Sequence, residues 1–343
     1  MPALECQPKA LKSPAKRKFV SCAENRSPPT RLQGRKRQVY LTLSQNRSSL
    51  KLPLVTVLEV IQRSTEFLNR KGVDSARLQT ELLLAHVLKT PRMQLYLNFE
   101  RTLRSEEEAA VRELIKRRGQ REPLQQIVGT ASFCGYEIKV NRHVLIPRPE
   151  TELLAEEGWK FLQGLSKLNV APTALDFGTG SGCIAIALAA KCPAASLFAL
   201  EKSAEALEVA RENAVRNRVA ERIQFLGADG FDALPTGARF HLIISNPPYI
   251  ASPEITTLQP EVRDFEPHQA LDGGPDGLDY YRRLAPEAAP HLAPGGKLML
   301  EFGDGQAEPI RQIFESKNWI VEAVRDDYTQ RPRILVLHGK PAN

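Results

Sequence analysis

The segment LDFGTGSGCIAIALA, residues 175–189, constrains the fold of this chain more than any other. It places an apolar, strand-like run before three glycines at alternate positions, and an apolar, helix-like run after them. Glycine lets the backbone turn sharply and approach a ligand closely, and the amides that follow lie at a helix N-terminus. The pattern predicts an α/β sheet with a nucleotide-like ligand at the carboxyl end of this strand.

The spacing of the glycines narrows the choice of ligand. A dinucleotide-binding turn has the pattern G-x-G-x-x-G, which requires a glycine where this chain has Cys183. The observed G-x-G-x-G instead suits S-adenosylmethionine (SAM), whose adenosine carries no pyrophosphate. The residues of this turn expected to bind SAM are Gly178, Thr179, Gly180, Ser181 and Gly182.

Two acidic residues follow later predicted strands. Glu201 ends the second strand, 19 residues after Gly182, where a carboxylate accepts hydrogen bonds from both ribose hydroxyls. Asp229 follows the third strand and is expected to contact the adenine or its surroundings. Taken alone, Glu201 could be an exposed turn residue, but its order and spacing after the glycines favour a cofactor site.

Strand and helix patterns alternate through the second half of the chain. Strands are predicted at 173–177, 196–200, 223–226, 241–245 and 297–302, and helices at 182–191, 204–217, 278–291 and 307–317. Repeated βα units predict a doubly wound parallel sheet. The last two predicted strands, at 319–324 and 333–338, are joined by a polar turn rather than a helix. We therefore expect them to form an antiparallel pair.

Residues 56–120 have helical periodicity and predict a small all-α domain. We expect a first helix capped by Thr56, a second capped by Asp74 with Leu78 facing inward, and a third opened by Ser105. Period-two alternation over 133–140 then predicts a β-hairpin.

Residues 1–51 form a basic segment without apolar periodicity, which predicts a disordered tail. It holds 12 Lys and Arg against 2 acidic residues, so the other 292 residues have 35 basic and 38 acidic side chains and are not basic. The tail could bind nucleic acid or ribosomes, or target the chain to an organelle. We favour a solvated tail or a start codon assigned too far upstream.

Several classes of protein are excluded by composition. The longest apolar stretch, 183–200, is interrupted by Lys191 and Pro193 and is too short for a membrane span. Five cysteines without a C-x-x-C pair indicate a reducing compartment, which we take as the cytoplasm. The six histidines form no metal-binding pattern, so no metal is expected.

The sequence Asn246-Pro247-Pro248-Tyr249 follows the fourth predicted strand. Successive prolines end a strand and fix a rigid turn with outward carbonyls, but a turn alone does not explain the flanking amide and aromatic ring. We expect the Asn246 side-chain oxygen and the Pro247 carbonyl to accept hydrogen bonds from a planar NH₂ group, with Tyr249 packed on its flat face. Such a site would aim the NH₂ nitrogen at the methyl group of SAM.

An NPPY segment after a fourth strand occurs in methyltransferases that act on amino groups of adenine, guanine and glutamine. Three further segments, REPLQQIVG (121–129), VLIPRPETE (144–152) and VRDFEPHQALDGGPDGLDYYRRL (262–284), narrow the choice. With them, residues 54–339 resemble the HemK/PrmC family, the protein-(glutamine-N5) methyltransferases of peptide chain release factors.

The resemblance implies a Rossmann-like class I SAM-dependent methyltransferase sheet with an antiparallel C-terminal strand pair, preceded by a small all-α domain. It divides the chain into the tail (1–51), a helical substrate-recognition domain (52–122), a β-hairpin linker (123–145) and the methyltransferase domain (146–343). It also implies a monomer that methylates the glutamine of the release factor's Gly-Gly-Gln loop.

The resemblance further implies roles for individual residues. Asn246 would contact both cofactor and substrate, and Asn246 to Tyr249, Pro248 included, would cradle the glutamine. The loop 147–152 would border the cofactor, and its Arg148 would contact the substrate. Two positions depart from the family pattern: Glu201 replaces an aspartate, and Gly230 stands where an aromatic residue often follows the acid, so adenine stacking would fall to Phe231 or be lost.

Two other functions share some of these features. An N6-adenine or N2-guanine methyltransferase of DNA or RNA would also have the NPPY segment, and the basic tail favours it, but the acidic body argues against it. A module that binds SAM or a release factor without catalysis would not need Asn246 and Tyr249.

Overall fold

The computed structural model describes residues 55–340. The predicted basic tail lies outside this range. No helix among these residues is long and apolar enough to cross a membrane.

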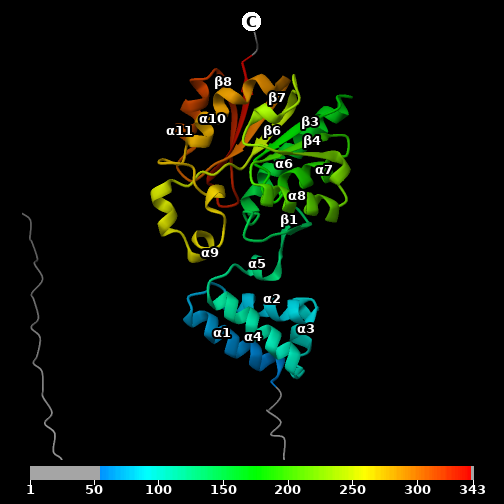
Figure 1. Ribbon diagram of the computed structural model, residues 1–343, viewed down its shortest axis with the longest axis vertical. Helices are drawn as coiled ribbons and strands as arrows, with labels where there is room; N and C mark the ends of the chain where they lie inside the picture. The colour runs from blue at the N-terminus through cyan, green and yellow to red at the C-terminus, as the bar shows by residue number, and fades with distance from the viewer. Residues whose placement is uncertain (1–54, 341–343) are drawn as a thin grey trace, which may run out of the picture. The chain divides into compact units, whose positions relative to one another are not determined.

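The described chain begins with five helices and then a β-hairpin (Figure 1). The helices are α1 (Val57–Arg70), α2 (Ala76–Leu88), α3 (Arg92–Leu97), α4 (Ser105–Gly119) and α5 (Leu124–Val128), and they enclose an apolar core of their own. Thr56 caps α1 as predicted, since its Oγ1 accepts from the Glu59 amide at 3.2 Å and the Glu59 carboxylate accepts from the Thr56 amide at 2.9 Å.

Three local predictions in this region are wrong. Asp74 does not cap α2, because the helix begins after Ser75, whose φ of 49° is left-handed. Leu78 is 42% exposed, and the buried face of α2 is formed by residues such as Leu83 and Leu84. The cap of α4 is Arg104 rather than Ser105, and its amide donates to Glu107 at 2.9 Å.

The hairpin consists of β1 (Thr130–Phe133) and β2 (Tyr136–Lys139), paired antiparallel. Phe133 and Ile138 are fully buried in the same core as the helices that cover the large sheet. The buried Asn213 ties the hairpin to that core: its Oδ1 accepts from the Lys139 amide at 2.7 Å, and its Nδ2 donates to the carbonyls of Lys139 and Ser181 at 3.0 and 2.9 Å. The hairpin therefore packs as part of the α/β core.

The rest of the chain forms a seven-stranded sheet of order β5-β4-β3-β6-β7-β9-β8. Its strands are β3 (Thr173–Phe177), β4 (Ser196–Glu201), β5 (Ile223–Gly227), β6 (Phe240–Ser245), β7 (Leu292–Glu301), β8 (Trp319–Asp326) and β9 (Pro332–Gly339). The first five strands in this order are parallel, and β9 pairs antiparallel with both β7 and β8. The predicted doubly wound sheet and its antiparallel end pair are confirmed.

Helices cover both faces of this sheet (Figure 1). One layer consists of α6 (Pro149–Lys167), α7 (Cys183–Lys191) and α8 (Ala204–Arg216), and the other of α10 (Asp279–Glu287) and α11 (Ala307–Glu315). The short helix α9 (Pro260–Arg263) lies in the long connection after β6. The order of strands reverses between β3 and β6, and ligands of such sheets bind at that point, outside the carboxyl ends of the strands.

Candidate functional site

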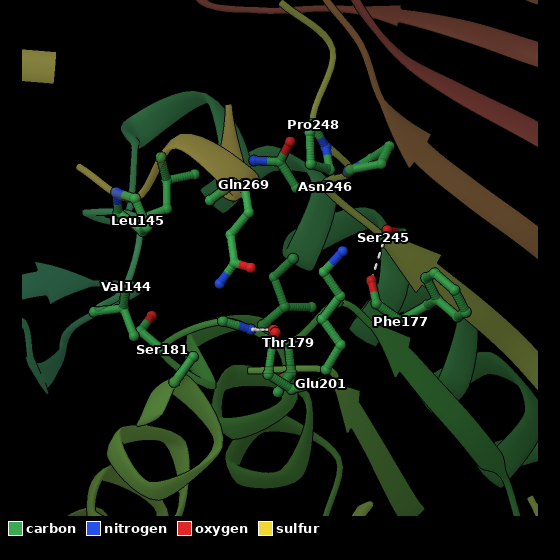
Figure 2. Close-up of a pocket in the computed structure, with 18 of the residues that line it drawn as sticks. Val144, Leu145, Phe177, Thr179, Ser181, Glu201, Ser245, Asn246, Pro248 and Gln269 are labelled. Carbon is green, nitrogen blue, oxygen red and sulfur yellow. Dashed lines mark hydrogen bonds between the residues drawn. The ribbon is translucent and has the colours of Figure 1, made fainter. Parts of the chain in front are cut away.

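A pocket of about 970 Å³, including its open mouth, lies at the carboxyl ends of β3, β4 and β6 (Figure 2). The predicted site residues that line it are Arg148, Gly178, Thr179, Gly180, Ser181, Glu201, Asp229, Asn246, Pro247 and Pro248. Gly182, Gly230 and Tyr249 are not among its lining residues.

The three glycines after β3 have two different structural roles. All have left-handed φ angles, 74° at Gly178, 55° at Gly180 and 81° at Gly182. A Cβ atom would meet nothing within 4 Å at Gly178 or Gly180, whereas at Gly182 it would lie 3.1 Å from the Ala210 Cβ on α8. The first two glycines therefore leave space in the pocket, and the third lets α7 approach α8.

The carboxylate of Glu201 holds the glycine turn against the end of β4. One oxygen accepts from the Gly180 amide and the other from the Ser203 amide, both at 2.9 Å. Figure 2 shows the side chain next to Thr179 at the floor of the pocket. A carboxylate has about four acceptor positions, so two backbone bonds leave Glu201 able to accept from ligand hydroxyls as well.

Asp176 fixes the turn from the interior. Its Oδ2 accepts from the Thr179 hydroxyl at 2.6 Å and from the Ala185 amide at 3.1 Å, which joins β3 to the first turn of α7. Burial raises the pKa of Asp176 to about 7, because the charged form is desolvated. It does not line the pocket, so it supports the turn from behind.

The NPPY segment leaves β6 with Asn246, Pro247 and Pro248 in the pocket wall. The Ser245 hydroxyl anchors this end of the strand to the Phe177 carbonyl at 2.6 Å (Figure 2). Asn246 Nδ2 donates to Thr151 Oγ1 at 3.0 Å, which leaves its Oδ1 as a free acceptor among the described residues.

Tyr249 packs behind this turn, against the core between the sheet and α10 and α11. Burial raises the pKa of its hydroxyl to about 12. Its backbone carbonyl accepts from Gln306 Nε2 at 2.9 Å. Tyr249 is not among the residues that line the pocket, and its packing on the substrate amide stays a prediction.

Arg148 lines the pocket, but its guanidinium is already paired. It donates to the carboxylate of Glu266 and, at 3.0 Å, to the Ile146 carbonyl, and the Ile146 amide donates to Glu266 at 3.1 Å. Glu266 is buried, so this pair joins two segments of the pocket wall, one before α6 and one after α9.

The segment after β5 has its acidic residue at the pocket, as expected, and its aromatic ring in the core. Asp229 lines the pocket and pairs with Arg283 at 2.9 Å. The Phe231 ring is buried between those of Phe177 and His291, with centroids 5.0 and 4.9 Å away. Of the two outcomes expected at this position, the packing of Phe231 agrees with the loss of stacking by that ring, and the pocket's aromatic lining comes from Phe177 and Tyr280.

Several lining residues were missed in the sequence. Leu145 lies in the VLIPRPETE segment and Gln269 in the long segment 262–284, and neither was singled out. Thr151, which also lines the pocket, lies in the loop 147–152 that was expected to border the cofactor. Gln269 extends into the pocket (Figure 2). Among residues 55–340, no group of three or more His, Cys, Asp and Glu side chains could hold a metal.

Comparisons with known proteins agree with this geometry. The PrmC N-terminal domain family matches residues 59–129, and the methyltransferase small domain family matches 157–259. The release factor glutamine methyltransferase of Geobacter sulfurreducens is 46% identical over 259 residues, 76% of this chain and 88% of that protein. That of Chlorobaculum tepidum is 44% identical over 277 residues, 79% of this chain and 93% of that protein.

The chain belongs to the release factor glutamine methyltransferase family. The family predicted from the NPPY segment and its companions is thereby confirmed, as are the class I methyltransferase fold and its enzymatic character. The helical region α1–α5 coincides with the family's own N-terminal domain.

Proposed function

We propose that this member of the family transfers the methyl group of SAM to the side-chain amide nitrogen, N5, of the glutamine in the Gly-Gly-Gln loop of peptide chain release factors. The proposal rests on the observation that two groups of residues line one pocket, a cofactor half and a substrate half. The glycine turn and Glu201 form one half, and the acceptor atoms of Asn246 and Pro247 form the other.

The residues present fit SAM. Gly178 and Gly180 leave open the space that side chains would fill, and the Glu201 carboxylate has acceptor positions for ribose hydroxyls. We assign the cofactor half to the turn together with Glu201 and Asp229. When bound there, SAM supplies an electrophilic methyl group.

The substrate half provides acceptors where the glutamine amide has donors. An amide nitrogen is a weak nucleophile because its lone pair is delocalised, so positioning must supply much of the rate. Holding two reacting groups in line can contribute about 7 to 11 kcal/mol. Asn246 Oδ1 and the Pro247 carbonyl would each accept one N–H, orient the nitrogen, and stabilise positive charge that develops on it during attack.

The remaining predicted residues have supporting roles in this proposal. Pro248 shapes the substrate wall, Tyr249 holds the turn from behind, and Arg148 joins two wall segments through Glu266. Gly182 and Gly230 maintain close packing beside the cofactor half: a Cβ at Gly230 would lie 2.6 Å from Arg283 Nη2.

In this proposal each predicted domain has its own function. The helical domain, residues 52–122, would help to grip the release factor, and the hairpin region 123–145 would join it to the methyltransferase domain, 146–343. We place the reaction in the cytoplasm with a monomeric enzyme. The tail is the part of the chain through which nucleic-acid binding or organellar targeting would act.

The experiment that tests the proposal is transfer of radiolabelled methyl from SAM to a purified release factor. Its controls are the same factor with the loop glutamine changed to alanine, duplex DNA and RNA. Label that appears on the release factor and disappears with the glutamine supports the proposal. Label on nucleic acid alone would contradict it and favour an adenine or guanine methyltransferase.

A further inference from the structure

Three polar side chains from three elements meet beside the substrate half of the pocket. Asn246 follows β6, and Glu301 is the last residue of β7. The residues just before them, Ser245 and Leu300, are paired in the parallel register, so Asn246 and Glu301 lie side by side. Thr151 comes from the first turn of α6. Thr151 lies in the loop 147–152 that was expected to border the cofactor, but neither it nor Glu301 was assigned a role from the sequence.

Both acceptors in this cluster face the N–H side of the Asn246 amide. Asn246 Nδ2 donates to Thr151 Oγ1 at 3.0 Å. Glu301 is 1% exposed, and its Oε2 has no hydrogen-bond partner among the described residues. Burial raises the pKa of Glu301 to about 7, and the nearby polar groups of Thr151 and Asn246 offset only part of that rise.

We propose that Thr151 and Glu301 are positioning residues that hold Asn246 with its Nδ2 turned away from the substrate and its Oδ1 turned toward it. This inference rests on the proposed function. A half-turn of the amide exchanges its donor and acceptor ends. A reversed Asn246 would oppose its own N–H groups to those of the glutamine amide, which would prevent binding in the reactive orientation.

The hydroxyl of Thr151 gives the chain of hydrogen bonds its direction. A hydroxyl has one proton, so Thr151 can donate to Glu301 while it accepts from Asn246. An ionised Glu301 can only accept hydrogen bonds. The Thr151 hydroxyl then donates to Glu301 and accepts from Asn246 Nδ2, which fixes the orientation of both groups. A protonated Glu301 can instead donate to Thr151, which frees the Thr151 proton for Asn246 Oδ1 and allows the reversed amide.

Among the side chains of this cluster, Glu301 is the group whose protonation changes near neutral pH. Arg333 lowers its pKa and Glu150 raises it, through their charges. Tyr249 and Tyr281 also face it, and burial raises the pKa of both hydroxyls, to about 12 for Tyr249 and well above its ordinary value for Tyr281, so neither ionises near pH 7. Activity should therefore fall as the pH drops through about 7.

The test uses the full-length enzyme and compares T151V, T151S and E301Q with the wild type. T151V keeps the shape of the side chain and removes the hydroxyl. We expect T151V and E301Q to lose about 10- to 100-fold in kcat, as for other groups that orient a functional side chain, with the Kd for SAM nearly unchanged. T151S should restore most of the activity lost in T151V.

T80V is the matched control for loss of a buried hydroxyl. Thr80 is fully buried in the helical core, and its Oγ1 has no partner among the described residues. T80V should keep wild-type kcat. E301Q should be no less stable than the wild type at pH 8, since a raised pKa means that ionised Glu301 opposes folding above pH 7.

A second readout does not depend on activity. The side-chain NH₂ signals of Asn246, observed by NMR in protein labelled at asparagine and identified through N246A, should shift with an apparent pKa near 7 in the wild type. They should not shift in E301Q. The inference would be overturned if T151V and E301Q kept the kcat of an active wild type. It would also be overturned if the pH dependence of the NH₂ signals were the same in the wild type and E301Q. A wild type that methylates no release factor, with the NMR titration as expected, would overturn the proposed function and leave the positioning role supported.

Discussion

Replacing Gly182 by alanine should destabilise the protein without removing a ligand contact. A left-handed φ, here 81°, costs an L-residue about 1 to 2 kcal/mol. The new Cβ would lie 3.1 Å from the Ala210 Cβ and 3.2 Å from its Cα, and such overpacking costs about 1 to 3 kcal/mol. We therefore expect G182A to lose about 2 to 5 kcal/mol of unfolding free energy.

Gly180 provides the matched comparison. Its φ of 55° carries the same backbone penalty, but a Cβ there meets nothing within 4 Å. G180A should therefore lose only about 1 to 2 kcal/mol. Because Gly180 lines the pocket and Gly182 does not, G180A should weaken SAM binding more than G182A, the reverse of their order in stability.

The assay is urea unfolding followed by circular dichroism, together with calorimetric titration of SAM. Making the G182A change in an A210G background should reduce its cost, because the 3.1 Å contact with the Ala210 Cβ is removed, while the 3.2 Å approach to the Cα and the backbone penalty of about 1 to 2 kcal/mol remain. Equal destabilisation by G182A and G180A, or a G182A cost that A210G does not reduce, would refute the packing role of Gly182.

Three further predictions concern the pocket. N246A should lose at least about 100-fold in kcat at saturating SAM and release factor, because it removes one preorganised acceptor; a near-normal kcat would contradict the role of Asn246. E201Q should raise the Kd for SAM about tenfold or more in a calorimetric titration, since hydrogen bonds to a charged group contribute about 1.5 to 3 kcal/mol; an unchanged Kd would count against the cofactor role of Glu201. A release factor with Gly-Gly-Glu in its loop should accept no methyl in a radiolabel assay, because its carboxylate would meet acceptors where donors are needed.

Much of the α/β fold follows from local patterns in the sequence. The predicted strands at 173–177, 196–200 and 223–226 match β3, β4 and β5 within a residue at each end. Apolar runs bounded by glycine or polar turns are strong signals for buried parallel strands. The segment 149–167 was not predicted as a helix, although a proline in the first turn of α6 is a usual helix start.

The errors in the helical region have physical causes. The inward face of α2 was assigned from Leu78, but Leu83 and Leu84 are buried instead; leucines lie on several sides of this helix, so spacing alone does not select the buried face. The cap of α4 was displaced because Ser105 and Glu108 satisfy the capping pattern, while Arg104 and Glu107 form the bonds. Local sequence does not distinguish such adjacent alternatives.

The site could be predicted as far as each residue acts through its own motif. Gly178, Gly180, Glu201 and Asn246 were found because turns and strand ends place them in the pocket. The placement of Tyr249 and Phe231 could not be found, since which face of a turn an aromatic ring covers depends on distant packing partners. Glu301 was missed because its position beside Asn246 depends on the register between β6 and β7.

The central claim is methyl transfer to one glutamine, and tandem mass spectrometry tests it most directly. Purified enzyme, SAM and a full-length release factor are incubated, and the peptide that contains the Gly-Gly-Gln loop is fragmented, with N246A as the control. We expect the wild type to add one methyl group to the side chain of that glutamine and N246A to add little. A loop peptide that stays unmodified, or a methyl group on any other residue, would contradict the account.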